Sequence, residues 1–315
     1  MSAFGKGLLA FGHRVWRAAE WRIARCVRGA KQLGQNAAFR GRNAAFRARN
    51  FLLLNRPLQM TVAGIPLRLA PRGAIATALW HAPGFEEREL RVILEFLRPG
   101  MTFLDAGANA GLWSLAAAKK MGVGHLFAFE PCASTFGLLQ ENIRHNGLGE
   151  LIVPVRTALG DRTGQATLKL NAPGKDGLNT LGRPTHSECE VVSQETVPVT
   201  TLDAFMESQG ITRVDVLKVD VEGAELPLFH GAAKLLGRPD GPLILYEGYS
   251  WCTAGFNYHP VEILWLLADF GYEFFGVAGA NGRAVPRRPA HGYDAMIIAA
   301  KPGHASFGKL TEGAT

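Results

Sequence analysis

Three charged residues, Lys218, Asp220 and Glu222, alternate at the end of a short apolar run of the chain. Side chains two residues apart on a β-strand point to the same face, so we expect these three to lie together. Unpaired charges are costly to bury, which leaves two interpretations. They form a structural ion cluster in which Lys218 neutralises both carboxylates, or a reactive site. In a reactive site, Asp220 would orient a hydroxyl group and accept its proton.

The roles within this cluster stay open, and two further residues join the candidates. Glu222 shares the proton transfer with Asp220 or holds Lys218. Alternatively, it binds a divalent cation together with Asp220 and Glu247, because carboxylate oxygens are the hard ligands that such ions prefer. Glu247 ends a second apolar run, and His259 lies at the start of a predicted helix. His259 is a second candidate base, since histidine titrates near neutral pH.

A glycine-containing turn lies nearer the N-terminus, between Asp105 and Gly111. Glycine lets the backbone turn tightly and approach a ligand closely, because it has no Cβ. A dinucleotide-binding turn would carry glycine where this chain has Asn109 and Leu112. The spacing D-x-G-x-x-x-G and its acidic start instead suit a ligand that carries an ammonium and a sulfonium. We therefore expect four residues to bind such a cofactor: Asp105, Gly107, Asn109 and Gly111.

Two acidic residues at the ends of the next predicted strands extend this site. Glu130 comes 23 residues after Gly107, and Pro131 ends the strand directly behind it. A carboxylate there can accept hydrogen bonds from both hydroxyls of a ribose. Asp161 follows a third strand and would meet an adenine amino group, although Gly160 and Asp161 also form an ordinary turn pair.

Three segments carry a resemblance to a known family: Leu104–Leu112, Val199–Asp203 and Val214–Glu225. Together with Glu247, they resemble the FkbM family of class I S-adenosylmethionine-dependent methyltransferases, over about residues 86–300. The pattern K-x-D-x-E-G-x-E is the most distinctive part. The resemblance implies S-adenosylmethionine as the cofactor. It also implies a hydroxyl group of a sugar, glycan, lipid-linked saccharide or secondary metabolite as the methyl acceptor.

The turn after the charged run favours an oxygen acceptor. Nitrogen methylation of nucleic acids or proteins usually comes with an N/D-P-P-Y/F turn at this place, and here Val221-Glu222-Gly223 stands instead. Two other classes remain as alternatives: a nicotinamide-dependent oxidoreductase, and a catalytically silent α/β module that binds a membrane or a partner. The glycine spacing argues against the first, and failure to bind S-adenosylmethionine would indicate the second.

The elements that must position these residues alternate between strand and helix. Apolar runs predict strands at Met101–Ala106, His125–Glu130, Leu151–Ala158, Val214–Asp220 and Leu243–Glu247. The stretches between them predict helices at Glu86–Leu97, Leu112–Lys120, Thr135–His145, Leu202–Gln209, Ala224–Leu236 and Val261–Phe270. We also expect a hairpin at Leu58–Ala70, a polar loop or hairpin insertion at Asn171–Glu190, and closing strands at Tyr272–Val277 and Asp294–Ala300. This order predicts a doubly wound, Rossmann-like α/β fold with a mostly parallel sheet, helices on both faces, and ligands at the carboxyl ends of the strands.

Charge divides the chain unevenly. Residues 1–56 hold twelve of the 34 basic residues and one acidic residue, a net charge of +11, whereas the remainder carries −4. We therefore expect a basic extension over residues 1–56, a methyltransferase domain over 57–302 and a flexible tail over 303–315. A mildly acidic body disfavours nucleic acid as a partner. The four cysteines are far apart and give no local metal-binding spacing.

The basic extension is predicted as an amphipathic helix. Leu8, Phe11 and Val15 fall on one side of it, and Arg14 and Arg17 on the other. Such a helix suits an anionic membrane surface or an acidic partner, or packs on its own domain or on a second subunit. We expect a cytoplasmic protein, peripheral at the membrane in the first case, that acts on a small-molecule or glycan acceptor. The oligomeric state stays open.

Overall fold

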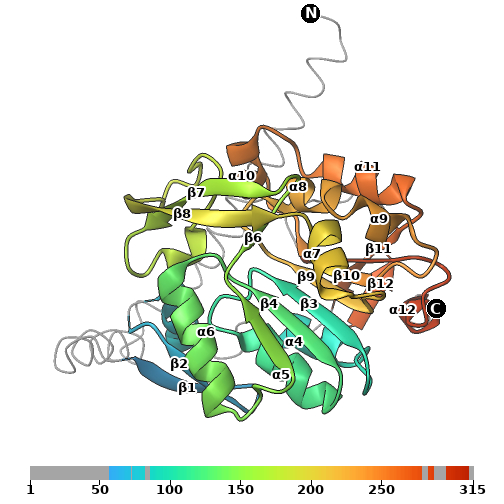
Figure 1. Ribbon diagram of the computed structural model, residues 1–315, viewed down its shortest axis with the longest axis horizontal. Helices are drawn as coiled ribbons and strands as arrows, with labels where there is room; N and C mark the ends of the chain where they lie inside the picture. The colour runs from blue at the N-terminus through green and yellow to red at the C-terminus, as the bar shows by residue number, and fades with distance from the viewer. Residues whose placement is uncertain (1–56, 72, 82–85, 279–282, 287–295, 312–315) are drawn as a thin grey trace, which may run out of the picture. The chain divides into compact units, whose positions relative to one another are not determined.

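The computed structural model describes residues 57–311, with gaps at residue 72 and at residues 82–85, 279–282 and 287–295 (Figure 1). The predictions for residues 1–56 lie outside the described residues, as do residues 312–315. Within the described part, no helix has the length and apolar character needed to cross a membrane.

In the described part of the chain, the main sheet has eight strands in the order β12-β11-β13-β10-β9-β3-β4-β5. Their bounds are β3 Thr102–Ala106, β4 His125–Phe129, β5 Ile152–Val155, β9 Val216–Val219, β10 Leu243–Glu247, β11 Glu273–Ala278, β12 Arg283–Pro286 and β13 Met296–Ala300. Strands β10, β9, β3, β4 and β5 are parallel, while β13, β11 and β12 pair antiparallel at one edge. This confirms the predicted doubly wound, mostly parallel sheet. The chain runs from β3 out to β5 and then returns to β9, so the topological switch point lies between β3 and β9.

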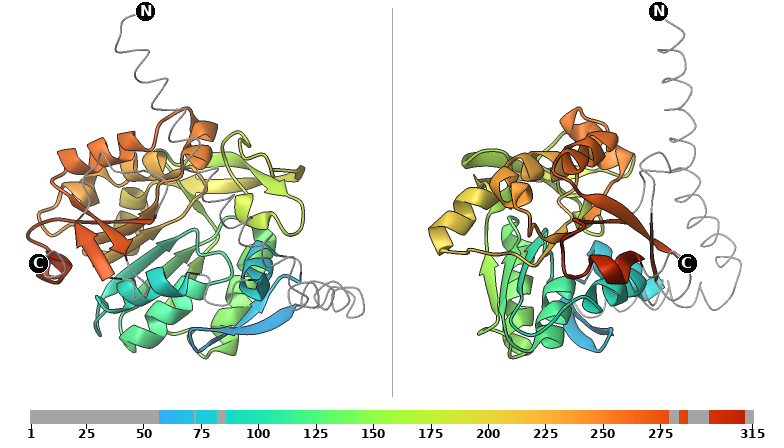
Figure 2. Two further views of the ribbon diagram at one scale, coloured as in Figure 1. Left: turned by 180° about the vertical axis from the view of Figure 1, so that it is seen from behind. Right: turned by 90° about the vertical axis from the view of Figure 1, so that its right-hand side faces the viewer.

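Helices cover both faces of this sheet (Figure 2). Leu104 of β3 points into a buried core. The helices that contribute to this core are α7 Leu202–Gln209, α8 Glu225–His230, α9 Ala233–Gly237 and α11 Val261–Asp269. The next residue, Asp105, points to the opposite face, where Ser114 of α5 (Leu112–Met121) donates a hydrogen bond to it. Because both faces are covered, the interiors of the parallel strands are almost wholly apolar, as the sequence predicted.

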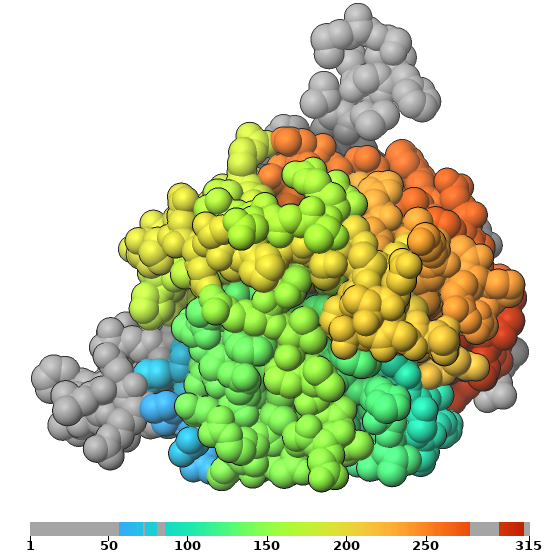
Figure 3. Space-filling view, in the orientation of Figure 1, coloured from blue at the N-terminus to red at the C-terminus, as the bar shows by residue number. Residues whose placement is uncertain are grey.

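A second, three-stranded sheet has the order β6-β8-β7 and lies above α6 (Ala133–His145) in Figures 1 and 3. Its strands are β6 Ala158–Leu159, β7 Gly164–Asn171 and β8 Val191–Thr200. The predicted strand Leu151–Ala158 is therefore divided, because β6 leaves the main sheet to pair with β8. The polar stretch predicted as a loop joins β7 to β8 and contains a short 3₁₀ helix, η1 (Asp176–Leu178). We call residues 172–190 the pocket loop.

The N-terminal hairpin is confirmed as β1 (Leu58–Val62) and β2 (Ile65–Leu69). Its two-residue turn has positive φ at Ala63 and Gly64, which matches the twist of an antiparallel pair. The helix α3 (Ala74–His81), which follows the hairpin, was not predicted, whereas α4 (Glu87–Leu94) was.

Two expectations differ from the structure. The single helix expected over Ala224–Leu236 is divided into α8 and α9. The carboxylate of Asp203 accepts from the backbone N–H groups of Lys234 and Leu235, so a residue outside the helix caps the start of α9. The tail predicted to be flexible is ordered over residues 303–311. Phe307 of α12 (Phe307–Thr311) packs edge-on against Phe275, and Leu310 has 0% exposed surface. Two apolar side chains three residues apart form a helical face that the sheet covers.

Candidate active site

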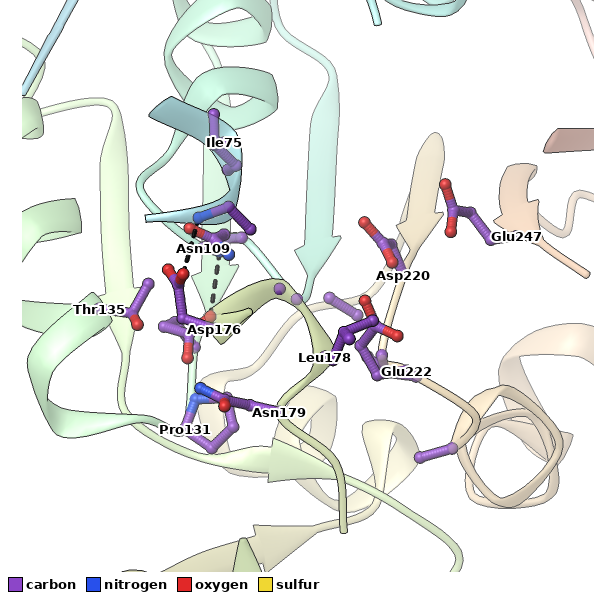
Figure 4. Close-up of a pocket in the computed structure, with 18 of the residues that line it drawn as sticks. Ile75, Asn109, Pro131, Thr135, Asp176, Leu178, Asn179, Asp220, Glu222 and Glu247 are labelled. Atoms are coloured by element: carbon purple, nitrogen blue, oxygen red, sulfur yellow. Dashed lines mark hydrogen bonds between the residues drawn. The ribbon is translucent and has the colours of Figure 1, made fainter. Parts of the chain in front are cut away.

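One pocket, of about 370 Å³, lies at the carboxyl ends of β3, β4, β9 and β10. Figure 4 shows two sides of it. Asp220, Glu222 and Glu247 lie on one side, Asn109, Pro131 and Thr135 lie on the other, and Leu178 of the pocket loop lies between them. The position agrees with the expectation that ligands bind beyond the strand ends at the switch point.

The glycine turn brings Gly107, Asn109 and Glu130 together, as predicted. Gly107 adopts φ 77°, and its Cα faces the backbone carbonyl of Asp220 so closely that a side chain would collide with it. Asn109 is also left-handed, with φ 49°, and its backbone N–H donates to Glu130 Oε2 at 3.0 Å. The turns after β3 and β9 and the end of β4 are therefore joined by direct backbone packing and one charge-assisted hydrogen bond.

Glu130 lines the pocket, and two backbone N–H groups hold its carboxylate in place. Its second oxygen, Oε1, accepts from the backbone N–H of Cys132 at 2.9 Å. Burial raises the pKa of Glu130 to about 7, although these two hydrogen bonds act in the opposite direction. A carboxylate has about four acceptor positions, so about two remain for hydroxyl groups of a ligand.

Lys218 is the cation at the centre of the site, with 2% of its surface exposed. Its Nζ lies 3.2 Å from Asp105 Oδ1 and 3.4 Å from Asp220 Oδ2, and it donates to the backbone oxygen of Gly107 at 2.8 Å. Burial alone would lower the pKa of Lys218, but the neighbouring carboxylates of Asp105, Asp220 and Glu86 raise it above its ordinary value. Lys218 therefore stays charged and positions its neighbours. The ion cluster considered in the sequence analysis exists, with Asp105 as the second carboxylate in place of Glu222.

Three residues predicted to bind the cofactor do not line the pocket: Asp105, Gly111 and Asp161. Asp105 is fully buried, and its carboxylate is taken up by Lys218 and by Ser114, whose Oγ lies 2.6 Å away. Gly111 begins α5 with φ 95°, and a Cβ there would collide with Leu115 and Leu139. Asp105 and Gly111 stabilise the glycine turn through contacts with the protein interior and do not face the pocket.

Asp161 and His259 are also placed away from the pocket. Asp161 is exposed and lies 3.8 Å from the guanidinium of Arg162, so the wall after β5 is formed by Thr157, Ala158 and Leu159 instead. His259 is exposed at the start of α11, where its Nδ1 accepts from the backbone N–H of Val261 at 3.3 Å. Neither Asp161 nor His259 lines the pocket with the other candidate residues.

Four carboxylates gather at the other end of the pocket: Glu86, Asp220, Glu222 and Glu247. Burial, and then the charge of Asp220, raises the pKa of both Glu222 and Glu247 well above the ordinary value. Burial also raises the pKa of Glu86 to about 7, while the indole N–H of Trp113 donates to Glu86 Oε2 at 2.8 Å. Asp220 keeps 26% of its side chain exposed, so this acidic end is open to a ligand.

The option of a divalent cation on Asp220, Glu222 and Glu247 is not supported by this geometry. Among the residues that the structure describes, no group of three or more histidine, cysteine or acidic side chains is arranged to hold a metal ion. The ammonium of Lys218 already provides a positive charge beside Asp220.

The sequence analysis missed several pocket residues. Glu86 and Trp113 form part of the acidic end, and Asp176, Leu178 and Asn179 come from the pocket loop. Asp176 Oδ1 accepts from the backbone N–H of Ala74 at 2.7 Å and so caps α3. The only signal in the sequence was that the Asn171–Glu190 stretch is too long and too polar for a simple connection.

The pocket residues fit a nucleoside that carries cationic groups. Gly107 has no side chain, so a ligand can approach its backbone closely. Glu130 has acceptor positions left for hydroxyl groups, and the carboxylates at the acidic end of the pocket attract an ammonium or a sulfonium. A site of this kind on a doubly wound sheet is typical of class I S-adenosylmethionine-dependent methyltransferases. More closely, the chain belongs to the FkbM methyltransferase domain family, whose model matches residues 105–274, more than half of the 315 residues.

Three curated methyltransferases are similar to part of the chain. Hexuronic acid methyltransferase AglP of Haloferax volcanii is 28% identical over 151 residues, which cover 48% of this chain and 58% of that protein. Methyltransferase sdnD of Sordaria araneosa is 29% identical over 152 residues, with 41% and 59% covered. Methyltransferase 1 of Beauveria bassiana is 30% identical over 141 residues, with 41% and 57% covered. The chain thus spans less than three fifths of the length of these relatives.

Proposed function

We propose that this methyltransferase transfers the methyl group of S-adenosylmethionine to a hydroxyl oxygen of a small-molecule acceptor. The acceptor class is a sugar, glycan, lipid-linked saccharide or secondary metabolite. One relative is named for a hexuronic acid, which supports a saccharide within this range. Membership of a methyltransferase family argues against the nicotinamide-dependent alternative.

The observation that carries the proposal is the pair of carboxylates, Asp220 and Glu222, at the end of β9. Both line the pocket, and the backbone of Asp220 packs against Gly107. A hydroxyl group is a poor nucleophile and gains from a base that accepts its proton as the new bond forms. The raised pKa of Glu222 makes its ionised carboxylate a stronger base than an exposed glutamate.

S-adenosylmethionine supplies an activated methyl group on a positively charged sulfur when it is bound. Glu130 would bind the ribose hydroxyls, and the turn at Gly107 and Asn109 would lie against the cofactor. Lys218 holds Asp220 in place, because its Nζ contacts both Asp220 and the Gly107 carbonyl. Alignment of acceptor and methyl carbon supplies most of the acceleration in such a displacement.

The test combines binding and turnover. Calorimetric titration with S-adenosylhomocysteine should show binding, and methyl transfer from labelled S-adenosylmethionine should be screened against hydroxylated acceptors, with magnesium and with a chelator. Asp220→Asn and Glu222→Gln should each reduce turnover on the order of 100-fold while S-adenosylhomocysteine still binds. Unchanged turnover in both variants, or a methylated nitrogen in the product, would overturn the assignment. Absence of cofactor binding would favour a catalytically silent module.

The net charge of +11 in residues 1–56 supports a second part of the proposal. We infer that this extension brings the enzyme to an anionic membrane surface, where lipid-linked acceptors are presented. A partner protein and the enzyme's own domain are the alternative binding surfaces.

A further inference from the structure

The turn that carries the candidate base is unusual in its backbone. Glu222 has φ 52° and Gly223 has φ 101°, so two successive residues lie in the left-handed region. A side chain at residue 223 would collide with the carbonyl of Cys252. A non-glycine residue such as Glu222 holds this conformation only when its surroundings enforce it.

One set of contacts holds the flanks of this turn. Glu225 Oε1 accepts from the backbone N–H groups of Val221 and Gly223, each at 3.2 Å. The hydroxyl of Tyr258 donates to the carbonyl of Gly223 at 2.8 Å. These contacts leave the carbonyl of Glu222 itself to be satisfied by another group, since a buried carbonyl without a partner is costly.

Thr180 of the pocket loop provides that group. Its Oγ1 donates to the carbonyl oxygen of Glu222 at 2.8 Å and accepts from the backbone N–H of Gly182 at 3.1 Å. Because the Gly182 N–H can only donate, the hydroxyl proton of Thr180 is directed to Glu222. Thr180 is only 8% exposed, so this hydrogen bond is largely shielded from water.

This hydrogen bond of Thr180 therefore links the pocket loop to the backbone of the candidate base, Glu222. Leu178 and Asn179, which immediately precede Thr180, both line the pocket (Figure 4). At its far end, the same loop is tied by Thr185, whose hydroxyl donates to the carbonyl of Trp251. Thr180, by contrast, forms its hydrogen bond with the turn that contains Glu222.

We propose that Thr180 is a positioning residue that keeps the Glu222 carboxylate aimed into the pocket. The proposal rests on the proposed function, in which Glu222 takes part in proton transfer. Loss of the hydroxyl would leave the Glu222 carbonyl and the Gly182 N–H unpaired, and the left-handed turn would relax. A displacement of about 1 Å at a reacting group can lower turnover on the order of 100-fold.

The experiment compares full-length variants. Thr180→Val removes the hydroxyl at nearly constant shape, and Thr180→Ser restores it. Thr185→Val removes a similar hydroxyl-to-carbonyl bond from the same loop without touching Glu222. For each variant, kcat and KM for the acceptor, the Kd for S-adenosylhomocysteine and the melting temperature are measured. Thr180→Ala replaces Thr180→Val if the valine variant does not fold.

We expect Thr180→Val to lower kcat on the order of 100-fold, with a Kd close to that of Thr185→Val. Its melting temperature should fall further than that of Thr185→Val, because Thr180 is buried and Thr185 is exposed. Thr180→Ser should recover most of kcat. Equal kcat in the two valine variants, or no recovery with serine, would overturn the positioning role. Glu222→Gln separates the two proposals. If it is active, the base assignment fails; if it is inactive while Thr180→Val is active, only the role of Thr180 fails.

Discussion

Replacing Gly107 with alanine tests how the cofactor turn and the catalytic turn are joined. A Cβ built on Gly107 would lie 1.8 Å from the backbone oxygen of Asp220, and real Cβ atoms do not approach closer than 3.0 Å. The two turns must therefore separate by about 1.2 Å, the difference between these distances. The left-handed φ costs an alanine about 1 kcal/mol, and overpacking costs about 1–3 kcal/mol more. We expect Gly107→Ala to lower the free energy of unfolding by about 2–4 kcal/mol.

Gly210→Ala is the matched control, because Gly210 is left-handed with φ 65° and ψ 25° and a Cβ there would meet nothing within 4 Å. It should cost about 1 kcal/mol only, from the backbone conformation. Urea unfolding followed by tryptophan fluorescence gives both values under the same conditions, and their difference isolates the contact with Asp220. Equal unfolding midpoints in the two variants would refute the argument, since the clash would then have been relieved without cost.

Four further outcomes follow from the charges and the pocket. Burial raises the pKa of Glu86 from 4.5 to about 7, so the folded state binds its proton more tightly and stability falls as pH rises through this interval. Glu86→Gln should therefore be more stable than the parent at pH 8 and equally stable at pH 4, by thermal melting at each pH. The rate of methyl transfer should rise with pH along a limb above the range of an ordinary glutamate, because the pKa of Glu222 is raised, and Glu222→Gln should lack this limb. Seven acidic and two basic residues are among the described residues that line the pocket, so neutral sugars should be methylated faster than matched hexuronic acids; a faster hexuronic acid would contradict this. Deletion of residues 1–50 should release the protein from phosphatidylglycerol vesicles in a sedimentation assay, and unchanged binding would rule out the membrane role.

The site residues that could be predicted from the sequence are those whose positions follow from the pattern of neighbouring residues in the chain. Alternation along a short apolar run predicted that Asp220 and Glu222 share a face, and the strand ends at Glu130 and Glu247 predicted their common edge. All four line the pocket. The parallel order also followed locally, because apolar runs separated by helices leave few arrangements of a sheet.

The contacts that escaped prediction depend on which strands become neighbours. Asp105 lies opposite Lys218 in the register of β3 and β9, although 113 positions separate them in the chain. The D-x-G motif alone therefore could not show that Lys218 would occupy its carboxylate. The pocket loop is a similar case, because Asp176 and Thr180 act through Ala74 and Glu222, which no local pattern connects to them.

In the pattern K-x-D-x-E-G-x-E, each of the five specified residues has a different structural role. Lys218 joins β9 to the glycine turn, and Asp220 shares its charge while facing the pocket. Glu222 presents a half-buried carboxylate from a left-handed turn, and Gly223 lets the chain pass the carbonyl of Cys252. Glu225 takes up the backbone N–H groups of the turn. Asp220 and Glu222 are therefore the two carboxylates of the pattern that line the pocket, and substitutions at the other three residues should act through the position of these two.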